Sequence, residues 1–247
     1  MKTDYEEYDV SMRERWLYIS QGILLSVLVN YLFYQNILLY IFMIPIPFFW
    51  YMFRKEERKQ RRKKELGYQF RDALNILSVS LRAGYSMENA LIEAEKDMRK
   101  LKGIRSDMVL ELSYMNRQIK VNIPVEELLT DFAQRSNLED IKNFAAVFAI
   151  ARRTGGNLTE IITDCVSRIN EKMEVDQAIA MAVAAKKFEQ TIMSCMPCAI
   201  ILYMKSTSPG FFDDLYGTFF GIIFMTVCLI LYGISFWMGR RIVKIEV

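Results

Sequence analysis

Few residues of this chain have the types and spacing that catalysis requires. The sequence contains no histidine, and this removes the commonest general base and the commonest metal ligand. Serine–histidine catalysis, cysteine–histidine catalysis and histidine-ligated zinc are therefore excluded. Cys195 and Cys198 match the redox pattern C-x-x-C. They lie inside an apolar run without a βαβ context, so we interpret them as inert thiols.

Two pairs of adjacent carboxylates, Glu126–Glu127 and Glu139–Asp140, carry oxygens of the kind that bind metal ions. Because both pairs fall on amphipathic helical patterns, we interpret them as solvated faces, with a metal site as the alternative. The chain also lacks a paired nucleophile and base. The sequence therefore predicts that the protein is not an enzyme and holds no cofactor and no metal.

A pair of adjacent glycines, Gly155 and Gly156, interrupts the stretch ARRTGGNLTEII, which begins at Ala151. A phosphate-binding loop would require G-x-x-x-x-G-K-[ST] after a strand, and a dinucleotide-binding fingerprint would also follow a strand. Neither context is present. Arg152 and Arg153 instead complement the dipole at the end of one helix, and a glycine takes the left-handed cap. The sequence predicts a corner between two helices.

A second corner is predicted at Gly84–Tyr85, in the stretch SLRAGYSMENAL, which has the same order of basic residue, glycine and capped helix. One interpretation is that both corners are purely structural. The other is that they form tips that face away from a membrane and bind a cytoplasmic partner. The candidate coupling residues are Gly84, Tyr85, Arg152, Arg153, Gly155 and Gly156.

Uncharged runs near both ends of the chain predict membrane spans. No residue from Trp16 to Phe53 is charged. This run is too long for one membrane span of about 20 residues and fits two, with a turn near Tyr34 and a bend at Pro45 and Pro47. Leu215–Gly239 is also uncharged and predicts a further span.

Charge placement decides whether the shorter uncharged run Gln190–Met204 spans as well. The basic run RKEERKQRRKK from Arg54 and the basic residues near the C-terminus are both expected to stay in the cytoplasm. An even number of spans must then separate them, so Gln190–Met204 pairs with Leu215–Gly239. The predicted fold class is an all-α membrane protein, a helical-bundle cytoplasmic domain with four transmembrane helices. The uncharged spans disfavour an ion-coupled transporter.

The basic run next to the second predicted span is expected to set the topology and to contact anionic lipid. Nucleic-acid binding is disfavoured, because the cluster is held at the membrane and lacks interleaved aromatic residues. The residues assigned to this role are Arg54, Lys55, Arg58, Lys59, Arg61, Arg62, Lys63 and Lys64.

The predicted domains follow from these runs. They are a cytoplasmic segment at 1–15, two transmembrane helices at 16–53, a cytoplasmic helical domain at 54–189, two transmembrane helices at 190–239 with an extracytoplasmic loop at about 205–214, and a cytoplasmic tail at 240–247.

Apolar residues recur at helical spacing throughout 54–189, where about six helices are expected. The helix boundaries have sequence signals of their own. Gly84 and Gly103 predict helix ends, Ser86 and Pro124 predict helix starts, and the stretches SNLE from Ser136 and NLTE from Asn157 have capping-box spacing.

Several stretches resemble the type II secretion system F-domain family. They are FRDALNILSVSLRAGYSMENAL, FAAVFAIARRTGGNLTEII, STSPGFFDDLY and GRRIVKIEV, within the part of the chain from Glu65 to Val247. Inside the family they are most similar to the platform proteins of Tad (Flp-type) pili. The resemblance implies an F-type domain at 54–189 and a multi-pass protein of the cytoplasmic (inner) membrane with both termini cytoplasmic.

The resemblance also implies a function and partners. Such proteins couple a cytoplasmic secretion ATPase to the assembly of pilin subunits, and a TadC-like sister platform protein usually accompanies them. Larger members carry two F domains, so this chain is expected to form a homo- or hetero-oligomer. The expected partners are the ATPase, the sister protein, pilin subunits and lipid, and no nucleic acid. The alternative is a membrane scaffold or signalling adaptor without a motor.

Overall fold

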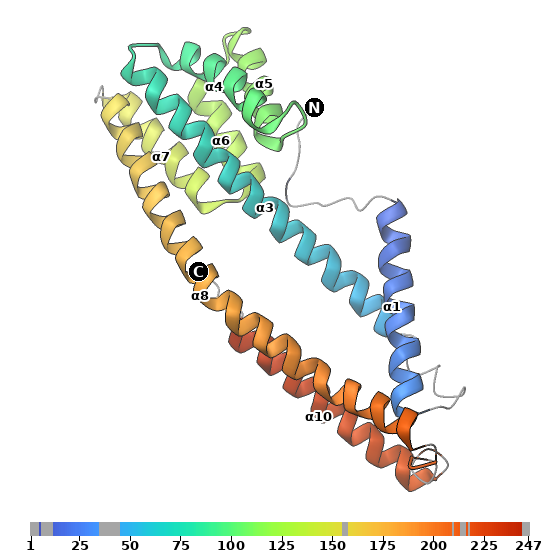
Figure 1. Cartoon of the computed structure of the whole chain (residues 1–247). Coiled ribbons are helices and arrows are strands. Elements are labelled where there is room, and N and C mark those ends of the chain that lie inside the picture. Colours follow the sequence, from blue (N-terminus) through green and yellow to red (C-terminus); the bar gives the residue numbers. More distant parts are fainter. Residues whose placement is uncertain are drawn as a thin grey trace. The chain divides into compact units, whose positions relative to one another are not determined.

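The computed structural model describes residues 5, 12–34, 45–154, 158–208, 210–212, 216 and 218–243. Within these ranges the regular structure is helical throughout (Figure 1), as predicted from the periodicity, and no strand occurs. The helices are α1 (Met12–Phe33), α3 (Pro45–Arg82), α4 (Met87–Lys102), α5 (Asp107–Ile119), α6 (Val125–Ser136), α7 (Glu139–Thr154), α8 (Leu158–Thr207) and α10 (Phe219–Val243).

The chain divides into two compact units. Unit 1 comprises Met1–Asp9 and Lys55–Glu174, and unit 2 comprises Val10–Arg54 and Val175–Val247. The long helices α3 and α8 each contribute residues to both units. The domain boundaries predicted from the sequence remain predictions.

Unit 1 is the predicted helical bundle. Its core lies between α3, α8 and the helix pairs α4–α5 and α6–α7. Phe70 of α3 contacts Phe132 of α6 and Phe144 of α7, with ring centroids 6.2 and 5.7 Å apart. Burial of one such aromatic ring contributes about 1.5–3 kcal/mol relative to leaving it in water. The other large, fully buried side chains are Leu66, Met98, Leu112, Met115, Ile141, Phe148 and Ile162.

Helix ends in unit 1 confirm some of the local signals and correct one. Ser86 caps α4, and its Oγ accepts a hydrogen bond from the backbone N–H of Asn89 at 3.3 Å. Gly103 ends the same helix with φ +82°. The capping box predicted at Ser136 is wrong, because Ser136 is the last residue of α6 and Asn137 follows in the left-handed conformation with φ 51°. Asn157 lies outside the described residues.

Unit 2 pairs the C-terminal part of α8 with α10 in antiparallel fashion (Figure 1). The hydroxyl of Tyr232 in α10 donates to the backbone oxygen of Ser194 in α8 at 2.6 Å. Nearer the C-terminus of α10, a Cβ placed on Gly239 would meet Gln190 of α8. These contacts place residues 190–194 of α8 beside residues 232–239 of α10.

The end of α1 packs on this helix pair. The ammonium of Lys205 in α8 donates to the backbone oxygen of Tyr31 at 2.6 Å and lies 3.7 Å from the centre of that residue's ring. The hydroxyls of Tyr34 and Thr226 are 3.0 Å apart. The C-terminal ends of α1 and α8 and the N-terminal part of α10 therefore meet in unit 2.

In the part of the chain that the structure describes, two helices, rather than the four expected, are long and apolar enough by themselves to cross a membrane. They are α1 and the segment Phe219–Gly239 of α10. Only 11 % of the apolar window of α10 is buried in the structure. A helix that is apolar and exposed to this degree differs from the core helix of a soluble protein, which packs its apolar residues inside.

The other two predicted spans do not form separate apolar helices. α3 begins at Pro45 and runs on through the whole basic run, so Pro45 and Pro47 occupy its first turn and do not bend it. Proline fits there because the first N–H groups of a helix have no intrahelical partner. Gln190–Met204 lies inside α8. Residues 35–44, which would complete the second predicted span, lie outside the described ranges.

Candidate partner-coupling site

The corner predicted at Gly84 ends α3 and leads into α4. Gly84 has φ +88°, its N–H donates to the oxygen of Leu81 at 3.0 Å, and the N–H of Tyr85 donates to the oxygen of Ser80 at 3.2 Å. This left-handed closure favours glycine, because a side chain there would be strained. The side chain of Tyr85 is 50 % exposed.

The second predicted corner begins at the C-terminal end of α7. The guanidinium of Arg152 lies 3.1 Å from a carboxylate oxygen of Glu126 and 3.8 Å from one of Glu88. Glu88 is in the first turn of α4 and Glu126 in the first turn of α6. Arg153 is exposed. Gly155 and Gly156 lie outside the described residues, so their predicted cap stays a prediction.

These contacts bring Gly84 and Arg152 to the same end of unit 1. Glu88, which contacts Arg152, follows the Gly84 turn by only four positions. Nearby, the guanidinium of Arg82 donates to the hydroxyl of Thr163 in α8 at 3.3 Å. We call this end, defined by Gly84, Tyr85, Arg152 and Arg153, the helix-end surface.

The charges of the helix-end surface follow the helix dipoles. Acidic side chains stand at the N-terminal turns of α4 and α6, and basic ones at the C-terminal turn of α7. Each such placement is favourable by about 0.3–1 kcal/mol. Because the side chain of Arg152 is 42 % exposed, its ion pairs contribute only about 0–1 kcal/mol.

The carboxylates considered as metal ligands are divided among separate ion pairs. Glu126 contacts Arg152, and Asp140 lies 2.9 Å from the ammonium of Lys172. Among the residues that the structure describes, no three histidine, cysteine or acidic side chains stand close enough together to hold a metal ion.

The basic run lies along α3 on both sides of the unit boundary. Lys55, Arg58, Arg61 and Lys64 are exposed. Arg62 is partly buried, and its guanidinium forms two hydrogen bonds with the carboxylate of Asp107, at 2.9 and 2.6 Å. Lipid contact by the run remains a prediction.

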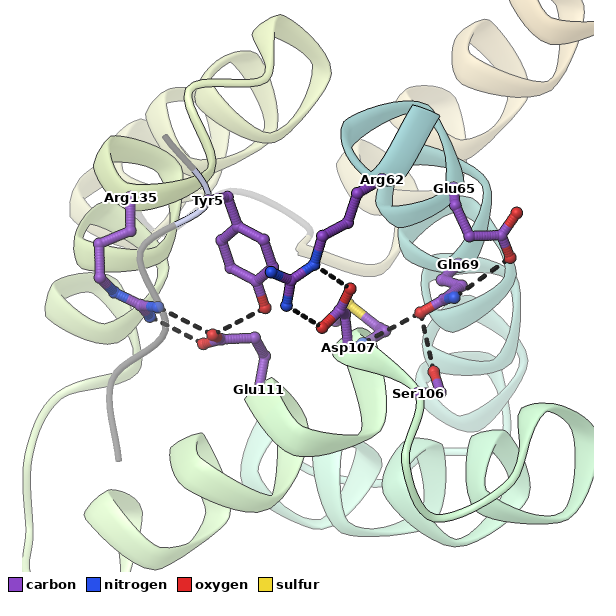
Figure 2. A network of polar contacts seen from close by, with 9 residues as sticks. Tyr5, Arg62, Glu65, Gln69, Ser106, Asp107, Glu111 and Arg135 are labelled. Carbon is purple, nitrogen blue, oxygen red and sulfur yellow. Dashed lines mark hydrogen bonds and ion pairs between the residues drawn. The ribbon is translucent and has the colours of Figure 1, made fainter. Parts of the chain in front are cut away.

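A polar network that the sequence pattern did not reveal surrounds Arg62 (Figure 2). Glu111 of α5 accepts two hydrogen bonds from Arg135 of α6, at 2.8 and 2.7 Å. The same carboxylate accepts a hydrogen bond from the hydroxyl of Tyr5 at 3.0 Å. We call the residues around this side chain, Arg62, Asp107, Glu111, Phe132 and Arg135, the Tyr5 seat.

One sequence signal could have indicated that Glu111 is paired. Glu111 falls on the same face of α5 as Met108, Leu112 and Met115, all of them buried. An acidic residue on an apolar face requires a partner, since an unpaired buried charge is too costly. The identity of the partners was out of reach, because Tyr5 lies 106 positions from Glu111.

The chain was compared with models of protein families, with curated proteins and with solved structures. No curated protein and no solved structure matches it. The family model described as "Type II secretion system (T2SS), protein F" matches residues 73–204, which is more than half of the chain and includes the helix-end surface. With its helical unit 1 and its apolar, exposed α10, this chain belongs to the type II secretion system protein F family.

Proposed function

We propose that this protein is a platform protein of the cytoplasmic membrane, most similar to TadB of Tad (Flp-type) pili, and that it couples a secretion ATPase to pilin assembly. Proteins of its family are typically membrane platform proteins of secretion and pilus systems, and they work with secretion ATPases and other platform components. The observation that carries the proposal is one chain in which residues of the family domain precede an apolar helix, α10, of whose apolar window only 11 % is buried.

The proposed topology has four spans with both termini in the cytoplasm. Its support in unit 2 is the antiparallel pairing of residues 190–194 of α8 with residues 232–239 of α10. If α10 crosses the membrane, the segment of α8 that pairs with it lies in the membrane as well. The C-terminal ends of α1 and α8 also meet, which agrees with both helices leaving the cytoplasm in the same direction.

The proposed mechanism is mechanical and not enzymatic. Movement of the ATPase is received at the helix-end surface, and α8, which contributes to both units, carries it to the spans that lift a pilin subunit from the bilayer. Exposed side chains such as Tyr85 and Arg153 are available for the contact. A TadC-like sister protein or a second copy of this chain supplies the second F domain.

In-cell photo-crosslinking tests the coupling surface. A photoreactive residue is placed at Tyr85, at Arg153 and, as a control, at Lys100, which is exposed near the other end of α4. We expect a secretion ATPase to be captured at Tyr85 and Arg153 and not at Lys100. Capture of the ATPase at none of these sites, with pilin and sister protein also absent, favours the scaffold or adaptor alternative.

Substitutions give a functional readout of the same proposal. Arg153→Glu reverses an exposed charge, and Gly156→Val fills the predicted corner. We expect both to reduce piliation while the protein remains in the membrane at its normal level. Normal piliation in both variants would rule out coupling through this corner.

A further inference from the structure

The side chain of Tyr5 is buried in unit 1 although it belongs to the N-terminal segment. It is 3 % exposed, and its ring meets that of Phe132 edge-on, with centroids 6.5 Å apart and planes at 72°. Its hydroxyl donates to Glu111 at 3.0 Å, and its backbone N–H contacts the oxygen of Arg135 at 3.4 Å. Figure 2 shows the ring between the side chains of Arg62 and Arg135.

The Tyr5 seat is held together by contacts that do not involve Tyr5. Arg135 pairs with Glu111 through two hydrogen bonds and with Asp131 at 2.9 Å. Arg62 keeps its two hydrogen bonds with Asp107. The seat therefore retains charge-paired walls when the tyrosine leaves, and departure exposes no unpaired charge.

A neighbouring contact fixes the wall that α5 forms. The amide oxygen of Gln69 in α3 accepts hydrogen bonds from the hydroxyl of Ser106 at 2.8 Å and from the backbone N–H of Met108 at 3.1 Å. These bonds hold the first turn of α5 against α3, so Asp107 and Glu111 are placed without help from the N-terminal segment.

The seat matches tyrosine in both its apolar and its polar parts. The guanidinium of Arg62 lies 5.1 Å from the ring centre, a distance suited to a cation–π contact. At the far end of the ring, Glu111 accepts a hydrogen bond from the Tyr5 hydroxyl. Burial and the nearby carboxylates of Glu111 and Asp107 raise the pKa of Tyr5, so the hydroxyl stays a donor at physiological pH.

The position of Tyr5 in the chain suggests what this contact does. Only residues 6–11 separate it from α1, which is one of the two helices long and apolar enough to cross a membrane. An extended chain covers at most about 3.3–3.6 Å per residue, so a seated Tyr5 limits how far the start of α1 can move from the seat.

We propose that the Tyr5 seat is a reversible docking site for a tyrosine-bearing segment, and that the N-terminal segment of the same chain occupies it as a latch ahead of α1. The latch does not depend on the proposed role in pilus assembly. It commits the site to one occupant, Tyr5 of the same chain, recognised by its ring and by its hydroxyl.

Peptide binding to the full-length protein in detergent tests whether the seat is exchangeable. The probe is a fluorescent peptide with the sequence of residues 1–11, and the receptor is the Tyr5→Ala chain. We expect the peptide to bind this chain about tenfold or more tightly than it binds the wild-type chain, whose seat is filled. A peptide with Tyr5→Phe lacks a hydrogen bond to a carboxylate, so we expect it to bind about tenfold more weakly.

Three results of the peptide experiment would overturn the proposal. They are no binding to the Tyr5→Ala chain, equal binding to the wild-type and Tyr5→Ala chains, and equal binding of peptides with tyrosine and with alanine at position 5. The first would mean that the contact is not exchangeable. The second would mean that the chain's own segment does not fill the seat, and the third that the seat does not read tyrosine.

Limited proteolysis tests the latch in the intact chain and does not require a vacant seat. A glutamyl endopeptidase cuts after Glu6 and Glu7, next to Tyr5 in the sequence. We expect cleavage there to be about tenfold faster in Tyr5→Phe, which keeps the ring, and faster still in Tyr5→Ala. Tyr85→Ala, at a tyrosine that is 50 % exposed, is the matched control and leaves the rate unchanged. Equal rates in all four proteins would contradict the latch.

Discussion

The guanidinium of Arg135 and the carboxylate of Glu111 form a two-bond ion pair that is nearly removed from water. Their side chains are 13 % and 4 % exposed, and the pair joins α6 to α5 at the base of the Tyr5 seat. Charges paired in this way stabilise a fold only as a pair, because either one alone would be buried without compensation.

Removing one partner of this pair is expected to destabilise unit 1 strongly. We expect Arg135→Ala to lower the free energy of unfolding by about 3–5 kcal/mol, and the double variant Glu111→Leu/Arg135→Met to recover much of that loss. Thermal unfolding followed by circular dichroism measures both. The control is Lys96→Ala, which removes an exposed ion pair with Glu93 and should cost at most about 1 kcal/mol. An Arg135→Ala protein as stable as the Lys96→Ala protein would contradict this account.

Asp72 is expected to make the stability of unit 1 sensitive to acid. Burial alone would raise the pKa of its carboxyl group, but hydrogen bonds from Arg71 and Lys102 outweigh burial and lower the pKa below its usual 3.8. A lowered folded-state pKa stabilises the fold above the unfolded-state pKa, and this contribution is lost as the pH falls through the folded-state pKa.

The measurement is the unfolding temperature of the wild type and of Asp72→Asn as the pH is lowered. The variant should be less stable at pH 7, and the difference between the two proteins should shrink below about pH 4. Asp97→Asn is the control, because its ion pair with Lys100 is exposed and joins residues of one helix. A difference that stays constant down to the lowest pH would show that the charge of Asp72 is not involved.

Replacement by alanine is expected to have opposite effects at Gly67, which lies within α3, and at Gly84, which lies in the turn that ends α3. Gly84 has φ +88° and open space where an added Cβ would lie, so Gly84→Ala meets no clash but strains the backbone, at a cost of about 1–2 kcal/mol. Gly67 lies within α3, also in open space, and Gly67→Ala should stabilise by about 0.5–1 kcal/mol. Chemical denaturation of the two variants measures the difference, and equal effects would contradict the left-handed turn.

Close packing at Gly22 is expected to be required in unit 2. A Cβ on this residue of α1 would come within 2.7 Å of the Cα of Pro47, which is backbone of α3 and cannot turn aside. We expect Gly22→Ala to lower stability in detergent by about 1–3 kcal/mol. Gly239→Ala is the matched control, since its Cβ would meet the flexible side chain of Gln190. Comparable melting temperatures for the two variants would show that α1 and α3 can separate at low cost.

The sequence alone determined features that depend on neighbouring residues. The stop at Gly84, the cap at Ser86 and the helical character of 54–154 were predicted, because turns, caps and helical periodicity arise from residues within a few positions of one another. The apolar character of α10 was equally clear, since an uncharged run is apolar whatever surrounds it.

Tertiary structure decided what local signals left ambiguous. Ser136 has the spacing of a helix start, yet it ends α6, where it is fully buried in the bundle. Pro45 begins a helix that continues through the basic run, so the second expected span is not a helix of its own. At Ser136 several local conformations were allowed, and packing in the bundle selected one.

The candidate site shows the same division. Arg152 was placed at a helix end by its sequence, but its contacts with Glu88 and Glu126 depend on how three helices meet. The Tyr5 seat was invisible from the sequence, because Tyr5, Arg62 and Glu111 become neighbours only after folding. A charged side chain on an amphipathic helix is solvated or buried according to what covers it, and only the tertiary structure decides what covers it.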